Sequence, residues 1–313
     1  MRKLTQKLVL SVVTMALVVI ALGTSTFAWF SLTNSAAVGQ FEAQVTAGEG
    51  IEVSLGTWAT NDASVTGSST WYTVIPAAVI QGRLTEMYST NLKLVDLTSE
   101  DGIVIEDLGG TGVNNLSGRY VEFKLFFRST AESTIVWNSA SLSGTAKAWT
   151  VDASFVGANL DTFTGAPTHT VGSTVQVAAW SAARVSIFNA DGTVGDVFQA
   201  AQSTGSTTAS VVYNSTALPA VSYAEDEEFG AASYQLAKND GVSIYTLPGA
   251  GYGAALEDVS AGIPVVTLVK AQPTDQYAFG TVIVRVWIEG WDADAFDAIF
   301  ATDLFVQLGF GKQ

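Results

Sequence analysis

Short stretches in which apolar and polar residues alternate recur along most of the chain, and they limit its fold more than any other feature. The clearest stretch ends at Arg128, and Val121, Phe123, Leu125 and Phe127 fall on one side of it when the backbone is extended. Val, Thr and aromatic residues are frequent in these stretches, and turn residues separate them. The pattern predicts an all-β chain that forms a β-sandwich with long loops over residues 39–313.

Further stretches of the same kind predict where other strands lie. Two of them flank Gly48-Glu49-Gly50 and predict a hairpin, and residues 282–288 are apolar on both faces, as in a central strand covered on both sides. One or two short helices are expected, over 224–236 and in the turns that follow Asp292. An insertion at about 157–247 elaborates the sandwich. The other predicted strands are 41–47, 51–55, 183–187, 264–270, 279–289 and 304–310.

The first residues have the organisation of a secretion signal. Three basic residues precede an apolar run from Leu8 to Gly23, and the small residues Thr26 and Ala28 follow it with the spacing that a signal peptidase recognises. Residues 1–28 are therefore predicted to be a signal peptide. The alternative is that residues 8–28 stay uncut as a membrane-anchoring hydrophobic helix. Either outcome places the remaining chain outside the cell, secreted or at the cell surface.

Charge and cysteine content narrow the partners and the chemistry. The leader contains three of the 14 basic residues and none of the 29 acidic ones, so the exported part is even more acidic than the whole chain, whose formal net charge is −15. This balance argues against binding nucleic acid or an anionic membrane surface, and it leaves the N-terminal segment, if uncleaved, as the route to a membrane. The chain has no cysteine, so a hydrophobic core rather than disulfides must hold it together.

The inventory of side chains does not predict an enzyme. His169 is the one histidine, in a stretch that has the composition of a loop, so neither a Ser-His-Asp triad nor a paired-histidine zinc site has its parts. No cofactor is expected apart from a possible structural Ca²⁺. Asp292, Asp294 and Asp297 could supply carboxylate oxygens to such an ion, although capping of a short helix explains the same residues.

Three aromatic residues lie near loops rich in Ser, Thr and Gly, namely Trp58, Trp71 and Tyr72. Such rings can stack on sugars, but core packing is the ordinary role of Trp in a chain with eight of them.

The leader ending Thr26-Phe27-Ala28, the aromatic start Trp29-Phe30-Ser31 and the cysteine-free β-rich body resemble the TasA and camelysin group of secreted matrix-fibre proteins from Gram-positive-type bacteria. The resemblance covers mainly residues 23–34. It implies a jelly-roll subunit that is released by a signal peptidase and forms filaments of an extracellular, biofilm-type matrix by donor-strand exchange.

In that scheme residues 29–38 are the donor strand. Phe30 and Leu32 point into the neighbouring copy, Trp29 lies on the opposite face, and the partner is the protein itself. Pairing of this strand within its own subunit is the competing interpretation. The alternative function is a membrane-anchored surface adhesin or binding module for calcium or a glycan.

Overall fold

The structure is a computed structural model that describes residues 41–48, 50–55, 70–88, 92–108, 110–113, 118–152, 155–156, 168–189, 192, 195–200, 258–292, 295 and 297–313, and the backbone of four two-residue strands between 208 and 222. Most of this part is β-strand, as predicted, and α2 (Ala77–Tyr88) is its one α-helix. No helix among these residues is long and apolar enough to cross a membrane. The predicted leader and the predicted helix at 224–236 lie outside the described residues.

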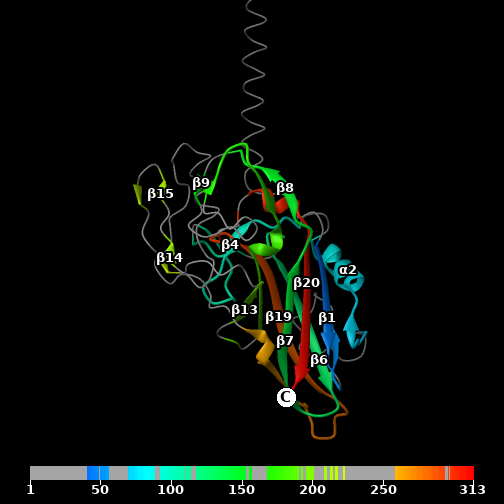
Figure 1. The fold of residues 1–313 in the computed structure, drawn as a ribbon. Coiled ribbons are helices and arrows are strands. Elements are labelled where there is room, and N and C mark those ends of the chain that lie inside the picture. Colours follow the sequence, from blue (N-terminus) through cyan, green and yellow to red (C-terminus); the bar gives the residue numbers. More distant parts are fainter. Residues whose placement is uncertain are drawn as a thin grey trace, which may run out of the picture.

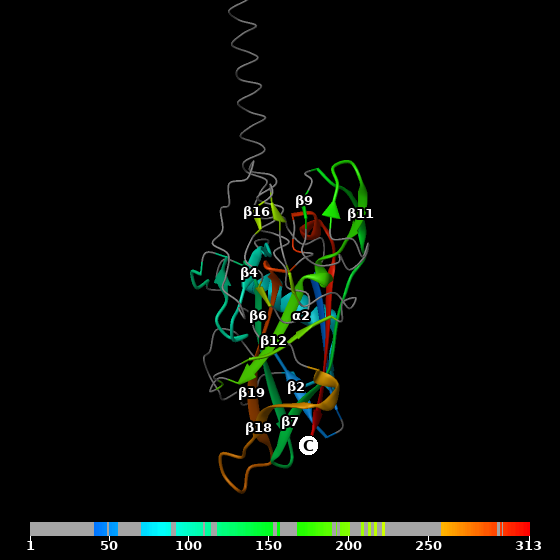
Figure 2. The same ribbon diagram turned by 60° about the vertical axis from the view of Figure 1, so that its left-hand side comes forward.

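Two sheets face each other and enclose the core (Figures 1 and 2). Sheet A has the order β18-β7-β20-β1-β3, and sheet B has the order β13-β12-β19-β6-β2, with β4 and β5 beside the end of β19. The strands of sheet A are β1 (Phe41–Ala47), β3 (Val74–Ile75), β7 (Ser133–Ser143), β18 (Ile263–Leu268) and β20 (Leu304–Lys312). Those of sheet B are β2 (Glu52–Ser54), β4 (Asp96–Thr98), β5 (Glu106–Asp107), β6 (Val121–Ser129), β12 (Ala183–Asn189), β13 (Asp196–Gln199) and β19 (Ala278–Glu289).

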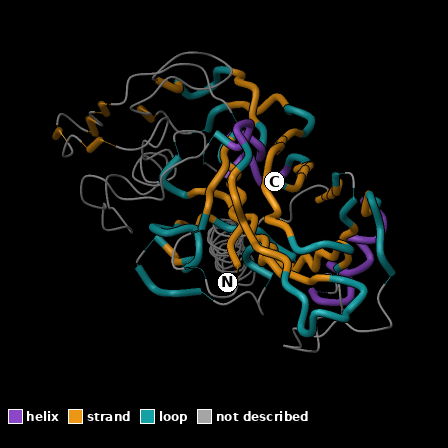
Figure 3. The backbone as a smooth tube through the Cα atoms, turned by 90° about the horizontal axis from the view of Figure 1, so that it is seen from below, coloured by secondary structure: helices purple, strands orange, loops and turns teal. Residues whose placement is uncertain are grey.

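Smaller elements decorate the two sheets. Seen end-on, the strands of the two sheets form the centre and the smaller elements lie around them (Figure 3). They are β8 (Lys147–Thr150), β9 (Phe155–Val156), β10 (Thr168–His169), β11 (Thr174–Val177), β14 (Thr208–Ala209), β15 (Val212–Tyr213), β16 (Thr216–Ala217) and β17 (Val221–Ser222), and three 3₁₀ turns, η2 (Ala179–Ser181), η3 (Val259–Ala261) and η4 (Asp297–Ala301).

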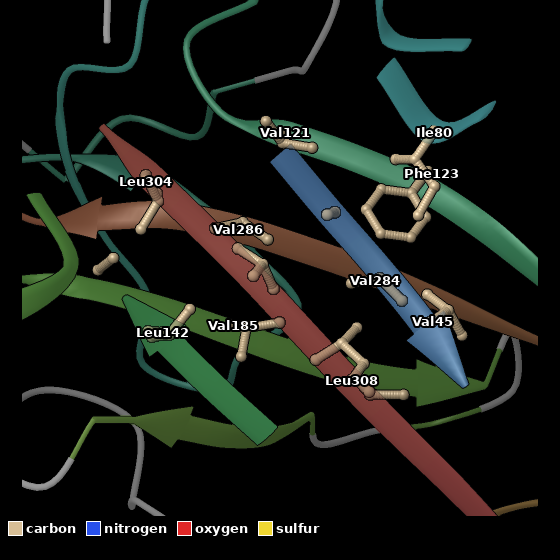
Figure 4. Packing of buried hydrophobic residues seen from close by; sticks show 14 of the residues in the cluster. Val45, Ile80, Val121, Phe123, Leu142, Val185, Val284, Val286, Leu304 and Leu308 are labelled. Atoms are coloured by element: carbon tan, nitrogen blue, oxygen red, sulfur yellow. The ribbon is translucent and has the colours of Figure 1, made fainter. Parts of the chain in front are cut away.

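The alternating patterns place their apolar side chains as predicted. In β6, Val121, Phe123, Leu125 and Phe127 are all buried, and the inward residues of β20 meet them from the other sheet. Figure 4 shows Leu304 and Leu308 of β20 lying over strands of sheet B. The core is therefore built from the period-two residues that were visible in the sequence.

The predicted hairpin at 41–55 is wrong, although both of its strands exist. β1 pairs with β20 and β3, whereas β2 pairs with β6, so the turn at Gly48 carries the chain from one sheet to the other. The apolar residues of both strands still face the same core, because the two sheets enclose it from opposite sides. Alternation fixes which face is buried but leaves the partner strand undetermined.

Two predictions near the C-terminal half are confirmed. β19 is a central strand between β12 and β6, and Val282, Val284 and Val286 are fully buried. The predicted strand at 183–187 is β12, which ends at Asn189 in a turn closed by a bond from the Gly192 N–H to the Asn189 carbonyl. The helical turns expected after Asp292 form as the 3₁₀ turn η4.

Candidate functional site

The N-terminal strand β1 occupies an unusual position for the first element of a domain. It lies inside sheet A and runs parallel to the last strand, β20, from the pair Phe41 and Leu304 to the pair Ala47 and Phe310. On its other side it pairs with β3 at Val45 only as far as Thr46. Without β1, the edge of β20 would be open and one side of the core uncovered.

The side chains of β1 divide cleanly between the two faces of the sheet. Ala43, Val45 and Ala47 are buried, and Val45 lies between Leu308 of β20 and the strands of sheet B (Figure 4). Thr46 faces outward and is exposed. The buried side chains are small, so β1 fills a narrow slot between β20 and β3 and is held mainly by backbone hydrogen bonds.

A short connection joins β1 to sheet B. The Gly48 N–H donates to the carbonyl of Phe310 (2.7 Å), and Gly50 has a positive φ of 77°, a conformation that favours glycine. Beyond β3, α2 packs through Ile80, Leu84 and Tyr88 and covers this side of the sandwich beside β1 (Figure 1). The edge of sheet A next to β1 is thus closed by chain that follows it in sequence.

The residues predicted for processing and assembly lie outside the described part of the chain. They are the cleavage-site residues Thr26 and Ala28 and the assembly residues Trp29, Phe30 and Leu32. β1 begins shortly after the predicted donor strand 29–38 ends, so it is the nearest described element to that segment.

Of the three residues predicted to bind calcium, Asp292 alone has a described side chain. It is 1% exposed and accepts a hydrogen bond from Nε2 of Gln199 (2.6 Å). Asp294 and the side chain of Asp297 lie outside the described residues. Among the side chains that the structure describes, no group of three or more acidic or imidazole groups is arranged to hold a metal ion. Calcium binding by these three residues stays a prediction.

Asp292 belongs instead to a buried cluster of charged and amide side chains in sheet B. Arg184 of β12, which is fully buried, donates from Nε to Oε1 of Gln199 (2.8 Å) and from Nη1 to Oε2 of Glu289 (3.3 Å). Glu289 also accepts from the indole N–H of Trp287 (3.2 Å). Burial raises the pKa of the Glu289 carboxyl, and the charge of Arg184 opposes that rise.

This cluster lies beneath a second apolar layer on the outer face of sheet B. That layer consists of Leu97, Ile105, Tyr120, Val197 and Trp287. Because Arg184 and Glu289 are both fully buried, the cluster stabilises sheet B and is closed to a ligand. The sequence analysis missed it, although an arginine within the apolar stretch 183–188 was a visible signal.

Two further arginines on sheet B are held by aromatic rings and carboxylates. The guanidinium of Arg128 lies 4.5 Å from the ring centre of Trp71 and 4.4 Å from that of Tyr277, and its Nε donates to Glu52 (2.7 Å). Trp71 is half-buried and serves as a packing residue here, while Trp58 lies outside the described residues.

Arg285 repeats the arrangement farther along the sheet. Its guanidinium lies 4.9 Å from the ring centre of Phe188 and 5.8 Å from that of Tyr120, and its Nε donates to Glu122 (2.6 Å). Both arginines are thus engaged within the protein.

Comparison of the chain with protein-family models, with curated proteins and with solved structures finds no match. The functional argument therefore depends on the sequence and on the geometry of the described residues.

Proposed function

We propose that the protein is a secreted structural subunit of an extracellular fibre or matrix, in which the N-terminal strand of one copy inserts into a sheet of the next. The position of β1 is the observation that carries the proposal. A strand at the start of the domain completes the middle of sheet A, and a neighbouring copy can supply a terminal strand without rearranging the rest of the chain.

The donor in this proposal is the segment 29–47, which joins the predicted assembly strand to β1. Its acceptor is the slot between β20 and β3, where each copy has already matched the alternation of Ala43, Val45 and Ala47. Residues 29–38 then span the junction, with Phe30 and Leu32 buried against the neighbour. Insertion of this kind is head-to-tail, so it builds a filament rather than a closed dimer.

The sheet order supports the proposal in a second way. The strands of a jelly roll are antiparallel, and a jelly-roll arrangement is part of what we propose for this subunit. β1 is parallel to β20, so it is an addition to an antiparallel scaffold. Signal peptidase releases the subunit after Ala28, and the assembled protein remains at the cell surface or in the matrix.

The absence of cysteine allows a direct test of which copy supplies β1. Gln44 and Gln307 are register partners on the outer face, and adjacent strands lie about 4.8 Å apart, within the range that a disulfide needs. The variant Gln44→Cys/Gln307→Cys, beginning at Trp29, is oxidised under conditions in which filaments form and is then separated by non-reducing SDS gel electrophoresis. Exchange predicts a ladder of covalent oligomers, whereas a band of monomer size alone contradicts it.

Negative-stain electron microscopy provides the second arm of the test. The protein from Trp29 to Gln313 is expected to form filaments, and the variant Phe30→Asp/Leu32→Asp is expected to remain monomeric and folded. Ser31→Asp/Thr33→Asp, which changes the alternate positions of the same segment, is the matched control and should still polymerise. Filaments from the Phe30→Asp/Leu32→Asp variant would exclude the segment from assembly.

A further inference from the structure

The outer face of sheet A is hollowed into a groove of about 340 Å³ where β1, β20 and β7 lie side by side. None of the residues that line it is charged, although the chain has 14 basic and 29 acidic residues. The polar side chains in the lining are Gln44, Thr46, Asn138, Ser139, Ser141 and Gln307.

A β-bulge places two consecutive polar residues on this face. Ser139 pairs with Gly309 and Trp137 pairs with Phe310, so Asn138 is an extra residue in β7 with no partner of its own in β20. Asn138 and Ser139 are therefore both exposed, where a regular strand would turn one of them inward. Bulges commonly re-aim side chains next to binding sites.

Two glycines of β20 keep the groove open. A Cβ added at Gly309 would lie 2.9 Å from Cβ of Ser139, and one added at Gly311 would lie 2.8 Å from Nδ2 of Asn138. Glycine within a strand weakens it and often marks a place where another group approaches the backbone closely. The bulge and the glycines together indicate a shaped surface rather than an ordinary solvated face.

We propose that this groove binds a neutral polysaccharide. Its amides and hydroxyls both donate and accept hydrogen bonds, as sugar hydroxyls do. The uncharged lining and the net charge of −15 disfavour a polyanion. The half-exposed ring of Phe305, two residues before Gln307 in β20, adds an apolar surface for the C–H face of a sugar.

An extended peptide fits this face less well than a sugar chain. Peptides that extend a sheet bind to its edge through the backbone, but β1, β20 and β7 are all paired on both sides over parts of the groove. Recognition here must come from side chains. The inference goes beyond the proposed assembly and does not depend on it, because Gln44 and Thr46 line the groove whichever copy supplies β1.

Affinity electrophoresis of the exported chain tests the proposal. Native gels contain dextran, hydroxyethylcellulose, glucomannan or galactomannan as neutral probes or alginate as an anionic probe, and migration is compared with that in a polysaccharide-free gel. We expect at least one neutral polysaccharide to retard the protein, and alginate not to. The variant Asn138→Ala/Gln307→Ala should bind about tenfold more weakly, since each hydrogen bond contributes a modest amount of free energy. Its control, Gln81→Ala/Gln176→Ala, removes two exposed amides elsewhere and should bind normally.

A second pair of variants separates blocking of the groove from damage to the fold. Ser141→Tyr fills the groove with a residue that strands accommodate, and Gln176→Tyr places the same side chain on β11, away from it. Equal thermal stability of the two, with binding lost only in Ser141→Tyr, supports the proposal. No retardation by any neutral polysaccharide, retardation by alginate alone, or equal binding of Ser141→Tyr and Gln176→Tyr would overturn it.

Discussion

Replacement of Arg184 by Met should destabilise the protein more than almost any other single change. The guanidinium is fully buried and is bonded to Gln199 and to Glu289, whose side chain is also fully buried. Methionine has a similar length and leaves little empty space, but it leaves the carboxylate of Glu289 buried without its ion pair. Removing one partner of such a pair typically costs about 3–5 kcal/mol.

The lost contacts give a similar magnitude. Two hydrogen bonds from a charged donor disappear, each contributing about 1.5–3 kcal/mol. We therefore expect the free energy of unfolding to fall by about 4 kcal/mol at neutral pH, and the urea midpoint to fall by about 1–2 M. The double variant Arg184→Met/Glu289→Gln should recover more than half of the loss, because no unpaired buried charge is left at this position.

The loss should also depend on pH. Burial raises the pKa of Glu289 in the folded protein above its ordinary value of 4.5, so the folded state binds this proton more tightly than the unfolded state does. The stabilisation from such a group is complete below the unfolded pKa and disappears as the pH rises through the folded one. Without Arg184 the folded pKa rises further, so the deficit of Arg184→Met should grow from pH 5 to pH 8.

Urea unfolding followed by tryptophan fluorescence at pH 5 and pH 8 measures both effects, with Arg83→Met as the control. Arg83 lies on α2, and its ion pair with Glu86 is exposed, so its loss should cost little. A cost below about 1 kcal/mol for Arg184→Met, equal at the two pH values, would refute the reasoning from buried charge.

Three further predictions concern stability and are checked by the same urea titration. Val45→Ala should cost about 2 kcal/mol because Val45 is fully buried beside β20, whereas Thr46→Ala on the exposed face should cost almost nothing. Arg128→Met should cost about 1 kcal/mol, and less at high salt, because the ring contacts and the pair with Glu52 are partly solvated; no salt dependence would argue against a charge contribution. Gly309→Ala should destabilise by about 1–3 kcal/mol through its contact with Ser139, while Gly82→Ala, with open space around it in α2, should stabilise; equal effects would contradict the contact geometry.

Much of the core was predictable because the alternation of apolar residues is a local signal. Strands such as β6, β19 and β20 carry it in nearly uninterrupted form, and the apolar face of each strand is buried. The partners of these strands were not predictable in the same way. β1 and β2 are adjacent in sequence yet lie in different sheets, because pairing depends on contacts with residues more than 70 positions away.

The charged cluster and the groove were missed for a related reason. Arg184, Gln199 and Glu289 come together only when β13, β12 and β19 align, and no short stretch of sequence contains two of them. The groove needs the bulge at Asn138, which exists only in relation to β20. The helix α2 was also missed, since its apolar residues Ile80, Leu84 and Tyr88 form a narrow stripe in a short segment.

The alternation that seats β1 in its slot does not decide which copy of the chain supplies it. A strand tethered through the short connection at Gly48 and Gly50 has a high effective concentration near its own slot, so pairing within one copy is favoured in dilute solution. Exchange replaces one β1 by another of the same sequence, so the contacts within the slot cancel. The balance then depends on what is gained outside the slot and on protein concentration. In the proposed fibre the gain comes from Phe30 and Leu32 at the junction. Cross-linked oligomers of Gln44→Cys/Gln307→Cys should therefore increase with protein concentration, and the further change Phe30→Asp/Leu32→Asp should shift the product to intramolecular disulfide at every concentration.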